Sequence, residues 1–271
     1  MSDLAGKTVL VTGAASGLGR LLAHKTAARG AEVVLWDVDG PAVERVRAES
    51  AGRGRRASAQ TVNLRDRAAV AAAAAETLAR HGRVDVLVNN AGVVTGKTLL
   101  DASDDEILRT FDVNTLALFW TTRAFLPQMI RRDSGHVVTI ASAAGVVGTS
   151  RLVDYCASKH AAVGFDESLR LELRRLGSHV RTTVVCPFYV TTGMFAGVRT
   201  RFPLLLPILD PEYTTDRIVR AIERGRRRVL LPRLVYTTYL ARLLPVAAFD
   251  AIMEFLGVNR SMDDFVGRAG H

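Results

Sequence analysis

Three glycines near the N-terminus have a spacing that suits phosphate binding. They follow the apolar run Val9-Leu10-Val11 and precede an Ala- and Leu-rich stretch. Glycine permits a tight turn and a close backbone approach to a ligand, and free amides at the start of a helix attract anions. A strand-to-helix turn needs some of these glycines in any case. The residues that could hold the pyrophosphate of a dinucleotide are Gly13, Ser16, Gly17, Leu18 and Gly19.

An acidic residue, Asp37, ends the second apolar run. A carboxylate at this position accepts hydrogen bonds from both hydroxyls of an adenosine ribose and repels a 2′-phosphate. The glycine loop carries Ser16 rather than a cation, and Asp37 is flanked by Trp36 and Val38. The sequence therefore predicts NAD rather than NADP as the cofactor. Alternatively, Asp37 could cap the turn before Gly40-Pro41.

Tyr155 and Lys159 lie one helical turn apart, a spacing that can support proton transfer. A free tyrosine, with a pKa of about 10, is a poor base near neutrality. A neighbouring ammonium group favours the phenolate, so we expect Lys159 to lower the pKa of Tyr155. Tyr155 could then take the proton of an alcohol. Either residue alone would more often be a packed helix residue.

Short β-branched runs alternate with Ala-rich helical stretches, a pattern typical of βαβ units. The predicted strands are Lys7–Thr12, Glu32–Asp37, Ser58–Asn63, Val84–Asn89, His136–Ser142, Arg181–Cys186 and Arg228–Leu231. The predicted helices are Leu18–Arg29, Pro41–Ser50, Arg67–His81, Asp104–Arg132, Val153–Leu176 and Tyr213–Arg224. We expect an α/β protein whose residues 1–271 form a single-domain, doubly wound Rossmann fold: a seven-stranded parallel sheet with helices on both faces.

Composition excludes several classes of protein. With 271 residues, 48% of them hydrophobic, the chain can bury a sizeable core and is not disordered. Two cysteines, Cys156 and Cys186, and six scattered histidines favour neither a disulfide framework nor a metal site. The net charge of +9 suggests first a solvated surface, and second an anionic ligand or membrane. No basic and aromatic run indicates nucleic acid, and without a targeting or membrane-spanning segment we expect a cytoplasmic protein.

Three motifs together resemble the short-chain dehydrogenase/reductase family over nearly the whole chain. They are Thr-Gly-x-x-x-Gly-x-Gly from Thr12, Asn89-Asn90-Ala91-Gly92 and Tyr155-x-x-x-Lys159. The resemblance implies a catalytic tetrad of Asn114, Ser142, Tyr155 and Lys159. In it Ser142 would hold the substrate oxygen, and Lys159 would bind the nicotinamide ribose. Asn114 would brace a water that links Lys159 to solvent.

The resemblance also places further cofactor contacts. Asn63 stands where family members often carry an Asp that binds adenine, and Leu64 would pack on the ring. The chain would pass close to the ribose at Asn90, Ala91 and Gly92, although Asn89 and Asn90 could equally hold neighbouring strands together.

The stretch from Pro187 to Thr192 departs from the family's Pro-Gly pattern, because Phe188 replaces the glycine. From its position in this pattern, Pro187 is still expected to contact the cofactor. The backbone of Val190 and the hydroxyl of Thr192 would fix the nicotinamide carboxamide. Phe188 would add an apolar wall beside the reacting carbon. With a side chain at this position, the sequence leaves the local backbone conformation undetermined.

The same region indicates the substrate. The run 187–202, the Leu- and Pro-rich stretch after it and Ser261-Met-Asp-Asp-Phe resemble the retinol dehydrogenase and 17-beta-hydroxysteroid dehydrogenase branch, which acts on lipophilic alcohols. Residues 194–209 are a candidate substrate lid, or else an ordinary core or subunit-contact helix. The predicted substrate pocket comprises Ser142, Tyr155, Phe188, Met194, Phe195 and Phe202.

The predicted C-terminal extension, residues 230–271, is largely apolar. It could pack on the lid, on another subunit or on a membrane surface, where Arg226, Arg227 and Arg228 would meet anionic headgroups. We expect subunit packing rather than peripheral membrane contact. Because the helices carrying Tyr155 and Asn114 form the family's usual dimer contact, the resemblance implies a homodimer or homotetramer.

The sequence thus predicts an NAD-dependent oxidoreductase that interconverts bulky lipophilic alcohols with ketones or aldehydes of retinoid, steroid or aryl ketone type. One alternative is a reductase of small polar carbonyl compounds, such as sugars or 3-oxoacyl thioesters. A second alternative, from another class, is a catalytically silent NAD-binding sensor or scaffold.

Overall fold

A single seven-stranded sheet forms the centre of the computed structural model, which describes residues 3–267. All strands are parallel, in the order β3-β2-β1-β4-β5-β6-β7. The strands are β1 (Thr8–Thr12), β2 (Glu32–Asp37), β3 (Ala57–Thr61), β4 (Val86–Asn89), β5 (His136–Ile140), β6 (Arg181–Pro187) and β7 (Arg228–Leu231).

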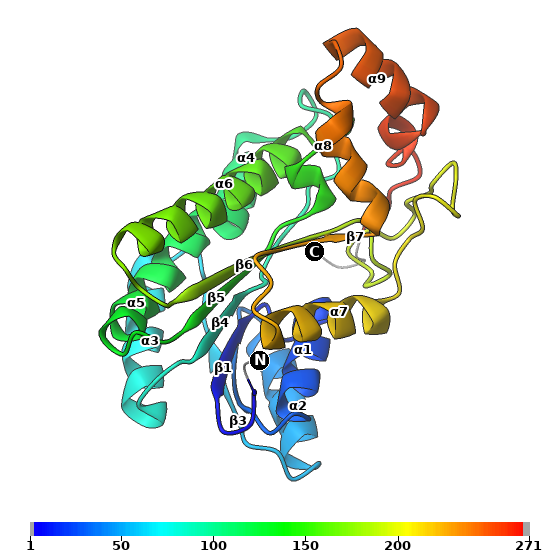
Figure 1. The fold of residues 1–271 in the computed structure, drawn as a ribbon. Helices are drawn as coiled ribbons and strands as arrows, with labels where there is room; N and C mark the ends of the chain where they lie inside the picture. Colours follow the sequence, from blue (N-terminus) through cyan, green and yellow to red (C-terminus); the bar gives the residue numbers. More distant parts are fainter. Residues whose placement is uncertain (1–2, 268–271) are drawn as a thin grey trace.

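Two layers of helices cover the sheet. The α-helices are α1 (Gly17–Ala27), α2 (Gly40–Ala51), α3 (Arg67–His81), α4 (Asp104–Phe111), α5 (Ala117–Arg131), α6 (Val153–Arg175), α7 (Pro211–Glu223), α8 (Thr237–Ala241) and α9 (Val246–Phe255). Helices α1, α2 and α7 lie on one face of the sheet and α3 to α6 on the other (Figure 1). Side chains alternate along each strand, so Val9 and Val11 join the core under α1 while Leu10 joins the core under α3 and α5. The predicted fold class is confirmed.

One predicted helix is wrong in detail. Asp104–Arg132 is not continuous, because a turn of π-helix, η1 (Asp112–Leu116), separates α4 from α5. Such turns are frequent at functional sites. Within η1, Asn114 bonds to the backbone of Val93, and Thr115 bonds to the carbonyl of Ser158. These long-range contacts fix the interruption, and local helix propensity does not reveal them.

The strand order reverses beside β1, whose neighbours are β2 and β4. Ligands of open α/β sheets bind at such a switch point, outside the carboxyl ends of the strands. The glycine loop follows β1, Asp37 ends β2, Ser142 follows β5 and Phe188 follows β6. Most of the predicted site residues therefore lie along one edge of the sheet.

The C-terminal part extends beyond β7 as short helices, with α8 and α9 at one end of the molecule (Figure 1). The turn η3 (Arg233–Tyr236) precedes α8, and η4 (Val258–Arg260) follows α9. The candidate lid, residues 194–209, is irregular rather than helical. Residues 268–271 of the predicted extension lie outside the described residues. Within residues 3–267, no helix combines the length and apolarity that crossing a membrane requires.

Candidate active site

The glycine loop has a geometry that only glycine fits. Gly13 and Gly17 adopt positive φ angles of 64° and 53°. A β-carbon on Gly13 would lie 2.8 Å from the Cα of Ala91. On Gly19 it would collide with the carbonyl oxygen of Gly13 and lie 2.6 Å from the Nδ2 of Asn90. Helix α1 begins at Gly17, directly after Ser16, so its first amides face this loop. The loop therefore fits the close approach of a pyrophosphate.

Asp37 links the end of β2 to the glycine loop. Its Oδ2 accepts a hydrogen bond from the amide of Ala15 at 2.9 Å, and its Oδ1 accepts one from the amide of Asp39 at 3.0 Å. The cap of α2 is Asp39, whose side chain accepts from the amide of Ala42. Asp37 thus caps the turn before Gly40-Pro41, as the alternative held, and its other oxygen also bonds to the glycine loop. Asp37 lies next to the glycine loop, at the position where the ribose adjoining the pyrophosphate would bind.

Asn90 and Asn89 are mainly structural. Asn90 Nδ2 donates to the carbonyl oxygens of Thr12 (2.9 Å) and Gly13 (3.2 Å), which joins the ends of β4 and β1. Asn89 bonds to Thr121 and Thr122 of α5. The alternative that these two residues hold neighbouring elements together is therefore seen directly. By doing so, Asn90 also shapes the glycine loop.

The remaining adenine-side residues lie at the expected edge. Asn63 is exposed, and its Oδ1 accepts from the amide of Arg65 at 3.1 Å. Leu64 is buried and belongs to the apolar core beneath α3. Ala91 is half-buried, and its amide donates to Thr12 Oγ1 at 3.1 Å. Contact of these residues with an adenosine stays a prediction.

The four tetrad residues come from three separate parts of the fold and are all buried. Ser142 follows β5, Tyr155 and Lys159 lie on α6, and Asn114 lies in η1. A side-chain hydrogen bond between Ser142 and Tyr155 works against the effect of burial on the pKa of this phenol. Lys159 Nζ lies 5.6 Å from the centroid of the Tyr155 ring and donates to the carbonyl of Ile140 at 3.0 Å. The structure thus brings the predicted tetrad together.

Asn114 links the loop after β4 to helix α6. Its Nδ2 donates to the carbonyl of Val93 (2.9 Å) and to Ser158 Oγ (3.0 Å), and its Oδ1 accepts from the amide of Val93 (2.8 Å). A β-carbon on Gly92 would lie 3.3 Å from Asn114 Oδ1 and 3.4 Å from Lys159 Nζ. Gly92 therefore allows the chain to pass directly over the tetrad. The water-bracing role of Asn114 stays a prediction.

Burial dominates the electrostatics of the site. Desolvation raises the pKa of Tyr155 above its ordinary value, and the hydrogen bond with Ser142 opposes this only in part. The net shift of the Tyr155 pKa is therefore upward, opposite to the direction expected from Lys159. Desolvation also lowers the pKa of Lys159 to about 8. The amine is thus close to its protonation equilibrium near neutral pH, which suits a proton relay.

Sequence reasoning missed Asp154, the neighbour of Tyr155. Its buried Oδ2 accepts hydrogen bonds from Thr95 Oγ1 (2.7 Å) and Thr110 Oγ1 (2.8 Å). These bonds join the start of α6 to α4 and to the loop after β4. An acidic residue directly before a candidate catalytic tyrosine was the available signal. Asp154 positions the helix that carries Tyr155 and is not itself placed to touch a substrate.

The segment after β6 has ordinary backbone geometry despite its departure from Pro-Gly. Within residues 3–267, only Asp133 and Arg151 combine a side chain with positive φ, so Phe188 does not need a glycine conformation. Its amide donates to the carbonyl of Leu231 at 2.7 Å. Val190 is buried and pairs with Leu209 through an isolated parallel bridge. The backbone of Pro187 accepts from Ser142 Oγ at 3.4 Å.

An apolar cavity of about 230 Å³ opens beside Ser142 and Tyr155. Phe188 and Phe195 line it as predicted, together with residues of α8, α9 and η3. Among the described residues that line the cavity, none is charged. The prediction that Met194 and Phe202 also line the cavity is wrong. Met194 is half-buried outside the lining, and the Phe202 ring packs against Phe255 at 5.5 Å.

The C-terminal residues pack on the candidate lid and on Tyr189, which was one of the three options that the sequence left open. Tyr189 and Ser261 share a hydrogen bond of 2.8 Å through their hydroxyl groups. Phe195 stacks edge-on against Tyr155 at 5.6 Å and lies 6.4 Å from Phe265. An aromatic cluster thus connects the candidate proton donor to the chain end.

Comparison with known proteins agrees with this geometry. Residues 7–201 match the family described as short chain dehydrogenase. Epidermal retinol dehydrogenase 2 of Mus musculus is 44% identical over 270 residues, which covers 98% of this chain and 87% of that protein. Retinol dehydrogenase 10 of Rattus norvegicus is 39% identical over 295 residues, covering 98% and 86%. The chain therefore belongs to the short-chain dehydrogenase family.

Solved structures show the same fold. A short chain dehydrogenase/reductase from Burkholderia phymatum, solved in complex with NAD, superposes with a TM-score of 0.81 at 30% identity, covering 90% of this chain and 95% of that one. A metagenomic short-chain oxidoreductase in complex with NADP gives a TM-score of 0.72 at 33% identity, covering 85% and 98%. The family thus includes users of either cofactor, so the choice must come from residues of this chain.

Proposed function

We propose that this protein is an NAD-dependent dehydrogenase that interconverts bulky lipophilic alcohols, such as retinoids, with their carbonyl forms. The observation that carries the proposal is the uncharged cavity with the hydroxyls of Ser142 and Tyr155 in its wall. Such a cavity offers an alcohol hydrogen-bonding partners and buries apolar surface over most of its wall. The relatives named retinol dehydrogenases support this class of substrate.

The cofactor fits the glycine loop, because α1 begins there at Gly17 and the amides at the start of a helix attract a pyrophosphate. The pyrophosphate would lie at Gly13, Ser16, Gly17, Leu18 and Gly19, and the nicotinamide end near Pro187, Val190 and Thr192. When bound, NAD accepts the hydride of the alcohol or returns it to the carbonyl.

The choice of NAD rests on Asp37. Its two carboxylate oxygens accept backbone hydrogen bonds from Ala15 and Asp39, which hold them beside the glycine loop. A carboxylate held there accepts bonds from ribose hydroxyls and repels a 2′-phosphate. We therefore expect a higher kcat/KM with NAD than with NADP.

The protein's own residues handle the proton. Tyr155 would exchange it with the substrate oxygen, which Ser142 holds by a hydrogen bond. Lys159, with a pKa near 8, would pass the proton onward and bind the nicotinamide ribose. Asn114 keeps the loop at Val93 over Lys159. The four groups come from α6, η1 and the segment after β5, so the fold preorganises them before the substrate arrives.

The oligomeric state and the cellular location of the protein both stay predictions. Leu116 and Phe119, at the start of α5, are each 41% exposed and offer an apolar surface for the expected homodimer or homotetramer. A cytoplasmic location likewise stays a prediction.

The test is the substitution Tyr155→Phe, assayed with all-trans-retinol and NAD. Loss of the hydroxyl should lower kcat by about 10² to 10⁴, the usual contribution of a positioned acid or base. The dissociation constant for NAD should stay within about threefold, because the phenyl ring keeps the packing.

Each alternative gives a different result in the same assay. A reductase of small polar carbonyls would prefer sugars or 3-oxoacyl thioesters to retinol. A silent NAD-binding scaffold would bind NAD without turning over any alcohol. Retained activity in Tyr155→Phe would refute the assignment of the proton donor.

A further inference from the structure

A second cavity, of about 570 Å³, lies away from the candidate active site, between α7, β7 and η3. Arginine side chains dominate its lining. They are Arg217, Arg220, Arg224, Arg226, Arg228 and Arg233. Apolar residues such as Val229 and Leu230 form the floor. The cavity therefore combines a hollow of ligand size with a dense array of fixed positive charge.

Local structure explains why the arginines gather. Arg217, Arg220 and Arg224 are spaced three and four residues apart, which places them on one face at the end of α7. Arg226 follows the turn at the end of α7, and Arg228 is the first residue of β7. The chain then turns back at η3 and adds Arg233.

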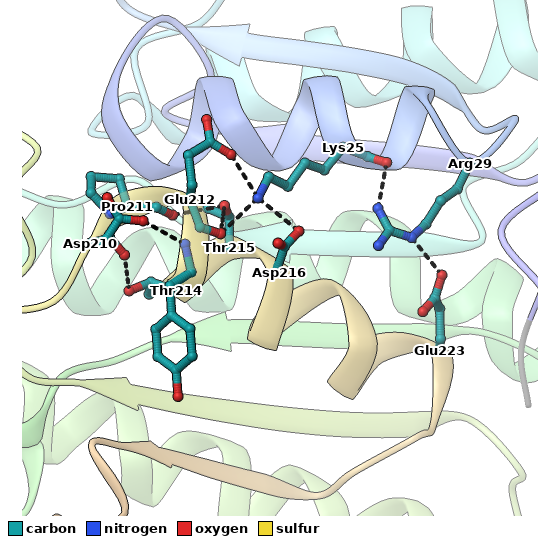
Figure 2. Close-up of polar contacts among 10 residues, drawn as sticks. Lys25, Arg29, Asp210, Pro211, Glu212, Thr214, Thr215, Asp216 and Glu223 are labelled. Carbon is teal, nitrogen blue, oxygen red and sulfur yellow. Dashed lines mark hydrogen bonds and ion pairs between the residues drawn. The ribbon is translucent and has the colours of Figure 1, made fainter.

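The acidic side chains of α7 are ion-paired with α1, although Asp216 also interacts electrostatically with Arg220 of the cavity. Lys25 pairs with Glu212 at 2.8 Å and with Asp216 at 2.7 Å, and Arg29 pairs with Glu223 at 2.7 Å (Figure 2). Helix α7 therefore has an ion-paired face toward α1 and an arginine-rich face toward β7.

Ion pairs account for only one of the six arginines. In the part of the chain that the structure describes, Arg228 pairs with Glu167, and none of the other five lies within ion-pair distance of a carboxylate. Arg228 also donates to Tyr239 Oη at 3.0 Å. Like charges gathered in one hollow repel one another, and an external anion would relieve this.

We infer that this cavity is an anion site that binds a phosphate-bearing group with two or more negative charges. Guanidinium groups present paired N–H donors that match phosphate oxygens, and several around one hollow can bind different oxygens of the same group. The floor of Val229 and Leu230 lowers the local polarity, which strengthens each of these interactions.

The site shares a wall with the substrate cavity. Arg233 and Tyr236 of η3 line the basic cavity, whereas Leu234 and Val235 of the same turn line the apolar one. An anion held by Arg233 would thus restrain a turn that shapes the substrate site. The ligand could be a free phosphate compound or an anionic lipid headgroup, since both present the same oxygens.

The lipid source has a structural argument of its own. Residues next to the shared turn expose large apolar side chains, with Leu240 70%, Leu243 82% and Val246 76% accessible. These residues would meet the acyl region if a headgroup occupied the basic cavity. The experiment therefore needs a soluble arm and a vesicle arm.

The test compares two triple variants of the full chain. Arg220→Gln, Arg224→Gln and Arg226→Gln remove three charges from the cavity. The control variant, Arg53→Gln, Arg174→Gln and Arg175→Gln, removes three exposed arginines elsewhere. Both sets lower the net charge equally, so a difference between them reports the cavity and not the overall charge.

The soluble arm titrates inorganic pyrophosphate by calorimetry. The cavity variant should bind about tenfold or more weakly than wild type, and the control within about threefold. The vesicle arm measures co-sedimentation with phosphatidylcholine vesicles, with and without phosphatidic acid. Loss of binding to the phosphatidic acid vesicles in the cavity variant alone would assign a lipid headgroup. Loss in the pyrophosphate arm alone would assign a soluble phosphate compound.

Some outcomes would overturn the inference. Equal affinities of the two variants in both arms would show that pyrophosphate binds elsewhere, for example at the glycine loop. A change of oligomeric state in the cavity variant alone, by sedimentation velocity and without loss of anion binding, would show instead a contact between copies. Melting temperatures of all three proteins check that each is folded. None of these readouts depends on the proposed dehydrogenase activity.

Discussion

The two halves of the active-site edge are built in different ways. The nucleotide half, around β1, β2 and β4, is held by short polar links between neighbouring strand ends, such as Asp37 to Ala15 and Asn90 to Thr12. The substrate half, beyond β5 and β6, is an apolar cavity lined by side chains from several separate segments, among them α6, α8 and α9. The backbone sets the shape of the nucleotide half, whereas the packing of side chains sets the shape of the substrate half.

Buried polar groups differ between the halves as well. In residues 3–267, the buried side-chain atoms that lack a hydrogen-bond partner belong to Gln128, Arg132, Thr139, Arg151 and Asp166. None belongs to the part from residue 3 to 127. Residues 3–127, which include the nucleotide half, thus leave no buried side-chain polar atom without a partner, whereas the later part of the chain leaves five such residues, none of which lines the substrate cavity. A rigid half can bind one constant cofactor, and a less constrained half can vary with the substrate.

The largest expected effect tests the rigid half. In Gly19→Ala, the new β-carbon would collide with the carbonyl oxygen of Gly13, and backbone atoms cannot move aside cheaply. We expect the dissociation constant for NAD to rise about 100-fold, which corresponds to about 2.7 kcal/mol. Calorimetric titration with NAD measures it directly.

Gly52→Ala serves as the matched control. Gly52 has a helical φ of −61° at the end of α2, and a β-carbon there makes only an ordinary contact of 3.4 Å with the carbonyl of Ala48. Its NAD affinity should equal that of wild type. Equal affinities for Gly19→Ala and Gly52→Ala would show that the glycine loop is not tightly packed.

The contrast between the halves also explains what the sequence could predict. The glycine loop, Asp37 and the Tyr155–Lys159 pair follow from residue type and spacing, because each depends on local backbone geometry. The strands were predictable for the same reason, since continuous apolar runs are typical of buried parallel strands. The structure confirms this fold.

The errors arise where distant segments decide the outcome. The π turn at Asn114 depends on Val93 and Ser158, which are remote in sequence. Phe202 has the right composition for the pocket, yet it packs against Phe255. Apolar composition identifies residues that will be buried, but it does not say which neighbour buries them.

A buried carboxyl group provides the second test. Asp166, on α6, accepts a bond of 3.4 Å from Thr182 Oγ1, and its Oδ1 lacks a partner. Desolvation raises the pKa of Asp166 from 3.8 to about 7. A raised folded-state pKa means that this group stabilises the fold below pH 3.8, and that the contribution is lost as the pH rises through 7.

The substitution Asp166→Asn should therefore change the free energy of unfolding only at higher pH. The amide keeps the shape without a charge, so we expect the free energy of unfolding to exceed that of wild type by about 2 kcal/mol at pH 8. At pH 4 the two proteins should be equal. Denaturant titrations at both pH values measure this. A constant difference at the two pH values would mean that Asp166 does not titrate in this range.

The smallest expected effect, on Phe188, tests the substrate half. Its ring lines the cavity beside Ser142 and Tyr155, and it stacks edge-on against Tyr189 at 4.6 Å. A bulky substrate gains about 25 cal/mol for each Å² of apolar surface that it buries, whereas 2-propanol gains little. Phe188→Ala should therefore raise KM for retinol about tenfold, or about 1.4 kcal/mol, and change the small alcohol far less.

Phe202→Ala is the control, because Phe202 lies outside the cavity lining and packs against Phe255. It should lower the melting temperature without changing the ratio of kcat/KM for retinol to that for 2-propanol. If Phe188 were only structural packing, its variant would behave in the same way, with an equal loss on both substrates. A loss restricted to retinol would show instead that the cavity wall selects the substrate by its apolar surface. That selection would come from side-chain packing, unlike the backbone fit that holds the cofactor.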